Sequence, residues 1–252
     1  MILAAPDKSP AAGAAPAGAH DRQTAARAVR EMFTAIAPRY DLLNHLLSMN
    51  VDRLWWRRAA LTFAHILACP GARVLDLCCG TADMALALRQ HSGASASIFG
   101  ADFSHAMLTL AHRKARGGVK LIEADALALP VPDACFDLLV SAFGFRNLAD
   151  YDAGLREILR VLRPGGEVGI LDFGEPKGVL GGIYRVYFRR VLPVVGTVIS
   201  GVRGPYSYLP ASVERFPDPS QMLERMRGAG FQEVNWVPYT FGIAGLYRGT
   251  KS

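Results

Sequence analysis

Short apolar runs alternate with segments of helical periodicity between Arg73 and Phe173, and this alternation constrains the fold more than any other feature of the chain. Strands that alternate with helices form parallel βαβ units, whose sheet is covered by helices on both faces. Five such strands are expected, with the sequences RVLDLC, SIFGAD, VKLIEAD, FDLLVSAF and EVGILDF. The pattern therefore predicts an α/β fold built on a doubly wound, mostly parallel sheet.

The end of the chain departs from this alternation. A helix expected over Ser220–Arg227 is followed by FQEVNWVPY and TFGIAGLYRGTK, two strand-like runs with no helix between them. Consecutive strands without a crossover helix pair in antiparallel fashion. We therefore expect a C-terminal antiparallel hairpin, or near-hairpin, at one edge of the sheet.

The remaining segments are expected to extend a single domain that spans residues 23–252. Residues 1–22 are rich in Ala, Gly and Pro, which is typical of a disordered tail, and their prolines interrupt the apolar core that a secretory signal requires. Residues 23–70 carry apolar side chains at helical spacing and are expected to form an N-terminal helical extension. Residues 177–215, which precede the C-terminal hairpin, are expected to form a lid-like insertion.

Charge and cysteine usage narrow the classes of partner. The formal net charge of +6 favours anionic partners without choosing among nucleic acid, a lipid surface and an acidic substrate. The four cysteines show no ligand spacing, so neither a disulfide framework nor a metal site is expected. The longest apolar stretch, Val191–Val202, is too short to cross a bilayer. We expect a cytoplasmic protein, either freely soluble or in peripheral contact with the inner face of the membrane.

The sharpest local signal is VLDLCCGTAD, residues 74–83, where the first predicted strand turns into a helix. An open α/β sheet binds its ligand at this edge. Gly80 permits a tight turn close to a ligand. Asp102, at the end of the second strand, can accept both hydroxyls of a ribose. Asp125, at the end of the third strand, is placed to accept from an adenine amino group, with the Ala126 backbone N–H serving a ring nitrogen.

The acidity of this turn separates two classes of nucleotide ligand. A dinucleotide site requires G-x-G-x-x-G, whereas Gly80 is the only glycine of the turn and Asp83 would repel phosphate. A nucleoside with a sulfonium group and an amino-acid tail fits better, because Asp76 and Asp83 can face its positive charges. Two of the acids also have a structural alternative, Asp83 as a helix cap and Asp125 as a turn residue. Three acids at the ends of three successive strands nevertheless favour a cofactor site.

These residues resemble the class I S-adenosylmethionine-dependent methyltransferases, whose sheet ends in an antiparallel hairpin. Two further segments, Tyr40–Arg58 and Ser141–Pro176, resemble the signatures of the quinone-biosynthesis C-methyltransferase family, and the second is centred on F-G-x-R-N. The resemblance runs from Thr24 to Lys251. It implies an enzyme that binds S-adenosyl-L-methionine and methylates a prenylated quinol.

The resemblance also implies particular contacts and substrates. A cofactor contact that the family often makes through serine falls on Ala142, and the neighbouring Ser141 would face the other side of its strand. The turn C-C-G-T-A-D resembles members that act on demethylmenaquinol, which implies C-methylation of demethylmenaquinol to menaquinol in menaquinone biosynthesis. The alternative substrate is a polyprenyl-methoxy-benzoquinol of ubiquinone biosynthesis, or both are used. The family's other cofactor contacts fall on four positions of this sequence: Thr81, Asp102, Asp125 and Ala126.

Methyl transfer to an aromatic carbon requires a reduced ring, held in line with the methyl–sulfur bond, and stabilisation of the phenolate-like charge that develops. Arg146 and Asn147 directly follow the fourth strand, where substrate would meet cofactor. Arg146 is expected to bind the quinol oxygen or orient a water, because a guanidinium titrates too high to act as a base. A structural ion pair is the alternative. Tyr40, with Asp41 and Asn44, is a further candidate for substrate contact or proton removal, and a merely buried Tyr40 is the alternative.

The segment Gly178–Arg203 is apolar, aromatic and basic. As a lid it would cover a prenylated ring and present its arginines to anionic lipid. As a helix packed on the sheet, or as the contact of a homodimer, it needs no membrane. Tyr206 and Tyr208 line the same pocket or simply pack. An RNA methyltransferase is a distant alternative that predicts steeply salt-dependent RNA affinity, and no nucleic acid partner is expected because the basic residues are scattered.

Overall fold

The computed structural model contains one sheet whose strand order confirms the predicted fold. Among the residues it describes, seven strands lie in the order β3-β2-β1-β4-β5-β7-β6. The first five run parallel, and β7 is antiparallel to both of its neighbours. Their bounds are β1 Arg73–Leu77, β2 Ser97–Asp102, β3 Lys120–Glu123, β4 Phe136–Ala142, β5 Leu162–Phe173, β6 Phe231–Tyr239 and β7 Ala244–Lys251. The described residues are 13–14, 16, 18–39, 48, 50–174, 176, 182 and 205–252.

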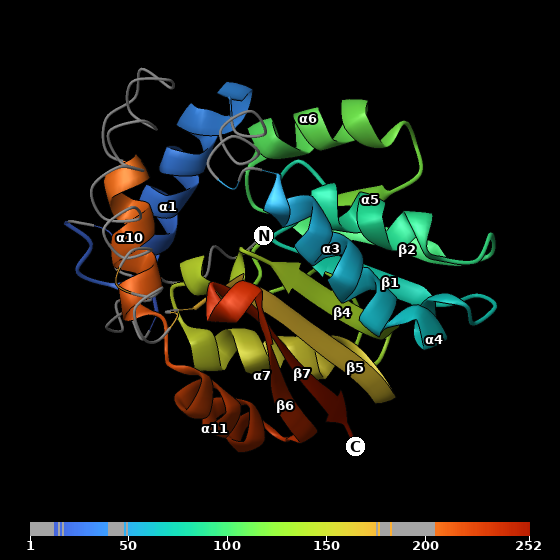
Figure 1. Ribbon diagram of the computed structural model, residues 1–252. Helices are drawn as coiled ribbons and strands as arrows, with labels where there is room; N and C mark the ends of the chain where they lie inside the picture. Colours follow the sequence, from blue (N-terminus) through green and yellow to red (C-terminus); the bar gives the residue numbers. More distant parts are fainter. Residues whose placement is uncertain are drawn as a thin grey trace.

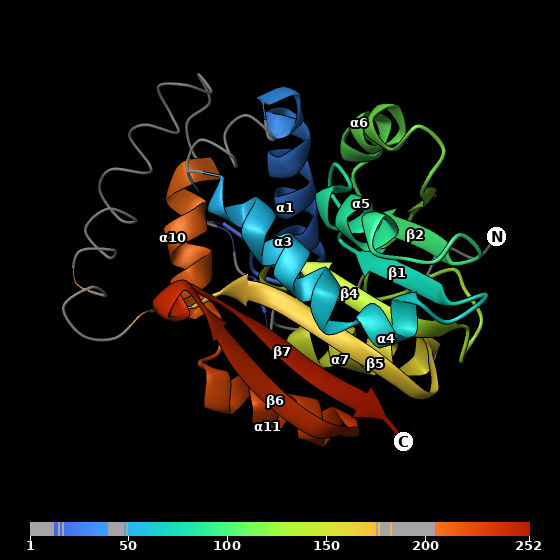
Figure 2. The same cartoon turned by 45° about the vertical axis from the view of Figure 1, so that its right-hand side comes forward.

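Helices cover both faces of the sheet (Figures 1 and 2). One face is packed by α3, α4, α5 and α6, and the other by α7 and α11. The bounds of these helices are α3 Val51–Thr62, α4 Ala64–Leu67, α5 Asp83–Gln90, α6 His105–Ala115, α7 Tyr151–Val161 and α11 Pro219–Ala229. The other helical elements are α1 Arg22–Ile36, η1 Ala37–Arg39, η2 Phe145–Asn147, α10 Pro205–Arg215 and η4 Thr240–Gly242.

The central strands are apolar throughout because each face of the sheet packs against a core of its own. Val74 and Leu75 are neighbours on β1, yet Val74 packs with Leu88 of α5 while Leu75 packs with the α7 side of the sheet. Successive side chains of a strand point to opposite faces. A strand buried on both faces therefore shows an unbroken apolar run, which is the pattern that predicted a parallel sheet.

The C-terminal antiparallel pair is confirmed, and it carries the chain back to the carboxyl end of β5. Phe173, the last residue of β5, pairs with Ala244, the first residue of β7. Tyr239, the last residue of β6, pairs with the same Ala244. The short η4 that joins β6 to β7 therefore lies at the edge of the sheet where the parallel strands end.

Two strand boundaries differ from the sequence expectation. α7 ends at Val161 and β5 already begins at Leu162, ahead of the expected run EVGILDF; Leu162 pairs with Phe136 before the register shifts. The glycines allow this irregularity, with Gly165 at φ 77. β3 ends at Glu123, because Asp125 closes a turn in which its carbonyl oxygen accepts from the Ala128 N–H at 3.0 Å.

The N-terminal segments contribute to the region above the strand ends. α1 begins with a capping box, in which the Asp21 carboxylate accepts from the Thr24 N–H at 2.8 Å, and it packs against α6 and α10. Ala14 lies in the segment expected to be disordered, yet it is buried and its N–H donates to the Leu148 carbonyl at 2.8 Å. This contact brings a residue of the predicted tail to the chain that follows η2, and Arg22, the last residue of that tail, is the first residue of α1.

Several residues singled out in the sequence lie outside the described part of the chain. They are Tyr40, Asp41 and Asn44, together with the segment Gly178–Arg203 apart from Gly182. The roles expected for them stay predictions. Within the described residues, no helix combines the length and the apolarity that a bilayer crossing requires.

Candidate active site

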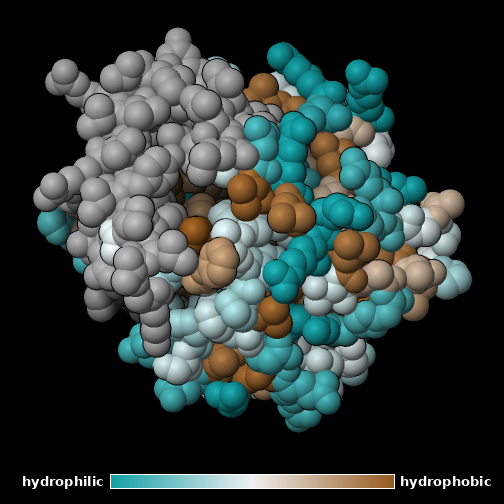
Figure 3. Space-filling model, in the orientation of Figure 1, coloured by the Kyte–Doolittle hydropathy of each residue, from teal (hydrophilic) through white to brown (hydrophobic). Residues whose placement is uncertain are grey.

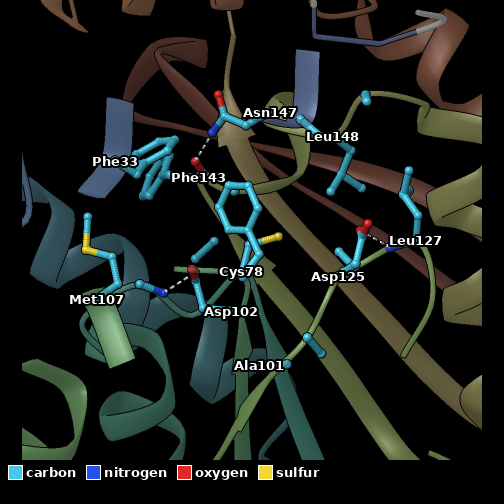
Figure 4. A pocket seen from close by; sticks show the side chains of 18 residues that line it. Phe33, Cys78, Ala101, Asp102, Met107, Asp125, Leu127, Phe143, Asn147 and Leu148 are labelled. Carbon is cyan, nitrogen blue, oxygen red and sulfur yellow. Dashed lines mark hydrogen bonds between the residues drawn. The ribbon is translucent and has the colours of Figure 1, made fainter. Parts of the chain in front are cut away.

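The carboxyl ends of the parallel strands surround a cavity that opens to solvent (Figure 4). Its walls come from segments far apart in the sequence. Phe33 of α1 and Met107 of α6 lie on one side, and Asn147 to Ala149 close another. The strand ends contribute Cys78, Gly80, Asp102, Phe103, Asp125, Ala126, Leu127, Ala142, Phe143 and Gly144.

Asp102 is fixed at the floor of the cavity by the backbone of two turns. Its Oδ2 accepts from the Gly80 N–H and its Oδ1 from the Ser104 N–H, both at 2.9 Å. The residue is only 7% exposed, and this burial raises the pKa of its carboxyl while the two N–H groups oppose the rise. Each carboxylate oxygen retains a second lone pair. The predicted role of Asp102, accepting ribose hydroxyls, stays a prediction that this geometry permits.

The turn after β1 holds strained backbone that the sequence did not reveal. Gly80 is left-handed with φ 53, as a tight turn requires, but Cys78 and Ala82 are also left-handed, with φ 57 and 71. Strain of this kind persists where the surroundings over-determine it and clusters at ligand sites. Burial raises the pKa of the Cys78 thiol, which therefore stays protonated at neutral pH.

Asp76 lies beneath this turn and is 1% exposed, so it is not among the residues that line the cavity. Its Oδ2 accepts from the Ala85 N–H at 2.8 Å, whereas Oδ1 has no hydrogen-bond partner among the described residues. Burial raises the pKa of Asp76 well above its usual range. An unsatisfied acidic oxygen beneath a ligand turn is compatible with a cationic ligand, and the expected role of Asp76 in facing that ligand stays a prediction.

Thr81 and Asp83 face α6 rather than the cavity. The Asp83 carboxylate pairs with Lys114 Nζ at 2.6 Å, and the Thr81 hydroxyl lies within 3.4 Å of the same Nζ. Lys114 therefore already compensates the charge of Asp83, which was expected to face the positive groups of the ligand. The contact of Thr81 with a cofactor stays a prediction.

The third strand end combines a turn with a cavity wall. Asp125 and Ala126 both line the cavity, and Asp125 Oδ1 accepts from the Leu127 N–H at 2.9 Å. Asp125 is thus a turn residue that also faces the site, so its two sequence interpretations are compatible. After β4, Ala142 lines the cavity while Ser141 is fully buried on the other side, as strand alternation requires.

Arg146 is held in a buried ion pair. Its Nη1 donates to Asp172 Oδ1 at 2.9 Å and also to the Phe143 carbonyl, and its backbone N–H donates to Asp172 Oδ2 at 3.1 Å. Arg146 is 6% exposed and is not among the residues that line the cavity. This geometry favours the structural ion pair over direct contact with a quinol. Sequence reasoning missed Asp172, whose only signal was an acid inside the apolar run of β5.

Asn147 lines the cavity and is hydrogen-bonded on both sides of its amide. Its Oδ1 accepts from the Tyr208 hydroxyl at 3.1 Å, and its Nδ2 donates to the Phe143 carbonyl at 3.4 Å. Tyr208 comes from α10, and burial raises the pKa of its phenol to about 12. The phenol is therefore a permanent donor that orients the Asn147 amide at the mouth of the site.

The charge of the cavity decides what it can bind. Asp102 and Asp125 are its acids, and no lysine or arginine appears among its described lining residues. Acidic groups beside apolar and aromatic walls suit a cationic nucleoside and disfavour a phosphate. Elsewhere in the described chain, no cluster of His, Cys, Asp and Glu has an arrangement that could hold a metal ion.

A seven-stranded sheet with this order and an acidic cavity at its switch point define the fold of the class I S-adenosylmethionine-dependent methyltransferases. The fold matches a SAM-dependent methyltransferase from Thermotoga maritima, with 20% identity, a TM-score of 0.60 and coverage of 89% of this chain and 100% of that one. It also matches the cyclase SpnF, with 20% identity, a TM-score of 0.66 and coverage of 94% and 98%. The fold alone therefore does not specify the reaction.

The sequence narrows the reaction further than the fold does. The chain belongs to the ubiE/COQ5 methyltransferase family, whose sequence model matches residues 20–251. A demethylmenaquinone methyltransferase of Deinococcus radiodurans is 48% identical over 92% of this chain and 95% of its own length. One of Thermus thermophilus is 50% identical over 87% and 100%. The protein is thus an enzyme that uses S-adenosyl-L-methionine as methyl donor.

Proposed function

We propose that the protein transfers a methyl group to a ring carbon of demethylmenaquinol and so forms menaquinol. The observation that carries this proposal is the match to two demethylmenaquinone methyltransferases at 48% and 50% identity over most of both chains. A benzoquinol of ubiquinone biosynthesis is the second candidate. A Geobacter sulfurreducens relative named ubiquinone/menaquinone biosynthesis C-methyltransferase supports it, at 44% identity over 88% of each chain.

The proposed donor site lies at the ends of β1, β2 and β3. Asp102 would accept the ribose hydroxyls, and Asp125 would accept the adenine amino group beside the Ala126 N–H. When bound, the sulfonium donor supplies an electrophilic methyl group. The donor-binding set proposed from the sequence is Asp76, Gly80, Thr81, Asp102, Asp125 and Ala126.

On the substrate side, we propose that Asn147 contacts the quinol oxygen, because its amide reaches the cavity and is oriented by Tyr208. Arg146 would act as a positioning residue, since its guanidinium binds the Phe143 carbonyl and Asp172. Through these bonds it holds the turn that carries Asn147. Tyr40 would contact the substrate or accept its phenolic proton. Fixed donors near the oxygen would stabilise the negative charge that it gains as the phenol loses its proton, which is the step that makes the ring carbon nucleophilic.

We propose that residues 177–215 form a lid that covers a prenylated substrate. Residues 23–70 would form a helical extension of the single domain 23–252, and the residues before 23 a disordered tail. The protein would work in the cytoplasm, in peripheral contact with the inner face of the membrane. A homodimer contact through the lid segment is the alternative, and no nucleic acid partner is proposed.

The proposal is tested with purified protein, a donor that carries a labelled methyl group, and demethylmenaquinol kept reduced. We expect label in menaquinol and none with oxidised demethylmenaquinone, because the oxidised ring lacks the phenol that makes the carbon nucleophilic. A parallel reaction with a polyprenyl-methoxy-benzoquinol decides between the two substrates. Absence of label from both quinols would refute the proposal.

A further inference from the structure

Three large apolar side chains are exposed among the described residues, and all belong to two adjoining elements. Leu54 and Leu61 of α3 are 57% and 46% exposed, and Phe241 of η4 is 80% exposed. Single exposed apolar residues are ordinary on protein surfaces. Their restriction to α3 and η4 is what requires an explanation.

The two elements are joined by specific contacts. Trp55 Nε1 donates to Thr240 Oγ1 at 2.8 Å, and the Arg58 guanidinium lies 4.2 Å from the centre of the Tyr239 ring. Figures 1 and 2 show η4 beside α3 in both views. Leu54 and Leu61 are one heptad apart and therefore share a helix face. The exposed apolar side chains therefore lie beside the contact that joins α3 to η4.

The backbone of η4 is strained in a way that presents Phe241 to solvent. Thr240 and Phe241 are both left-handed, with φ 45 and 58. This conformation is unfavourable for a bulky side chain and more so for a β-branched one. Strain at an exposed tip persists when the surroundings impose it, here through the hydrogen bond from Trp55, and it is a mark of functional sites.

The charges around these groups favour one class of partner. Arg53, Arg57 and Arg58 are exposed on α3, whereas its only acid, Asp52, is buried. Figure 3 shows hydrophobic and strongly hydrophilic side chains next to one another over α3. Apolar side chains ringed by arginines match a surface of anionic lipid headgroups and acyl chains. A second copy of this face would instead bring like charges together.

We propose that Leu54, Leu61 and Phe241, with Arg53, Arg57 and Arg58, form a docking surface for an anionic lipid bilayer. The surface lies at the edge of the sheet where the cavity opens, because η4 precedes Ala244, the first residue of β7, which pairs with the last residue of β5. Trp55 connects it to the site, since its ring centroid is 5.7 Å from that of Phe143, which lines the cavity. This inference rests on the proposed function: with the docking surface at this place, a prenyl tail can remain in lipid while the quinol ring enters the cavity.

The test measures binding of the full chain to vesicles of phosphatidylglycerol mixed with phosphatidylcholine, and to phosphatidylcholine alone, by flotation. The apolar variant is L54Q/F241N, because Gln is a good helix former and Asn tolerates a left-handed backbone. The charge variant is R53Q/R57Q. Its matched control is R113Q/R227Q, which removes two exposed arginines from α6 and α11.

We expect binding to the anionic vesicles only. Affinity should fall about ten-fold in L54Q/F241N, and about five-fold for each arginine removed from the docking surface. R113Q/R227Q should lose less than R53Q/R57Q. Equal binding by wild type and L54Q/F241N, or no binding by wild type, would overturn the proposal. So would a wild-type dimer that L54Q/F241N dissociates in vesicle-free sedimentation, because the face would then bind a second copy.

Methyl-transfer assays distinguish a failure of the docking surface from a failure of the proposed function. L54Q/F241N should methylate a short-tailed, detergent-soluble demethylmenaquinol at the wild-type rate, and a long-tailed quinol in anionic vesicles more slowly. If neither protein methylates either quinol, the proposed function fails while vesicle binding still decides the docking surface. If both methylate the vesicle substrate equally, the docking surface fails alone.

Discussion

Arg146 and Asp172 form an ion pair that is closed to solvent, with Arg146 Nη1 2.9 Å from Asp172 Oδ1 and side chains that are 7% and 0% exposed. The same guanidinium binds the Phe143 carbonyl and lies over the Phe173 ring. The signature arginine therefore joins the turn after β4 to the end of β5. Removal of either partner would leave a buried charge without compensation.

We predict that Asp172→Asn lowers the free energy of unfolding by about 3–5 kcal/mol, because the Arg146 charge remains buried without its partner. Urea denaturation followed by circular dichroism measures this loss. The control is Asp133→Asn, which removes a partner of Arg160 that is 76% exposed and should change stability by less than about 1 kcal/mol. A loss in Asp172→Asn no larger than in this control would show that the pair does not hold the turn.

The Tyr208–Asn147 hydrogen bond leads to a prediction about catalysis. Tyr208→Phe removes the donor that orients the Asn147 amide, and we expect kcat to fall about three- to ten-fold, the range for one neutral hydrogen bond. Donor affinity should be unchanged. Tyr247→Phe is the matched control, because it removes a buried phenol oxygen from the core. An unchanged kcat in Tyr208→Phe would exclude the orienting role.

The same variant has an expected pH profile. Burial raises the pKa of Tyr208 to about 12, so its phenol remains protonated and donating through the neutral and mildly alkaline range. Any alkaline decline in kcat below pH 11 therefore arises from another group. The midpoint of that decline should be the same in wild type and Tyr208→Phe, and a shifted midpoint would contradict this assignment.

Local patterns in the sequence were sufficient to predict the fold and part of the site. Unbroken apolar runs identified the parallel strands because those strands are buried on both faces. The acids Asp102 and Asp125 could be placed at the cavity because the carboxyl ends of parallel strands meet at one edge. The glycine at position 80 likewise indicated a left-handed turn, which the structure confirms.

The remainder of the site depends on contacts between distant segments, which no local pattern encodes. Arg146 meets Asp172 across 26 residues, and Asn147 meets Tyr208 across 61. The pairing of Asp83 with Lys114 on α6 could not be read from the turn itself. Cys78 belongs to a residue type without a left-handed preference, so its strained backbone left no signal.

Asp102 leads to a prediction about donor affinity. In Asp102→Asn one accepting oxygen is replaced by an amide nitrogen that donates, so the Gly80 or the Ser104 N–H loses its acceptor. We expect the affinity for S-adenosyl-L-methionine to fall about 10- to 100-fold, and further in Asp102→Ala. Calorimetric titration measures both, with Glu224→Gln on α11 as an exposed control. Wild-type affinity in Asp102→Ala would remove the basis of the donor site.

Asp76 leads to a prediction in which stability and binding change in opposite directions. Burial raises its pKa well above 3.8 in the folded protein. An acid whose folded pKa is raised stabilises the protein below its unfolded pKa, and this contribution is lost as the pH rises through the folded pKa. Asn cannot ionise, so Asp76→Asn should be more stable than wild type at neutral pH, although it should bind the cationic donor less tightly.

The pH dependence of stability distinguishes the ionisation of buried Asp76 from a simple packing effect of the substitution. The stability difference between Asp76→Asn and wild type should widen as the pH rises from 5 toward 8, because the buried wild-type carboxyl keeps a proton that the unfolded carboxyl gives up. Thermal unfolding across that range measures it, and the exposed Asp133→Asn should show no comparable trend. A difference that stays constant with pH, or that favours wild type at pH 8, would mean that Asp76 is ionised in the folded protein at little cost. Its unsatisfied Oδ1 would then no longer point to a cationic ligand.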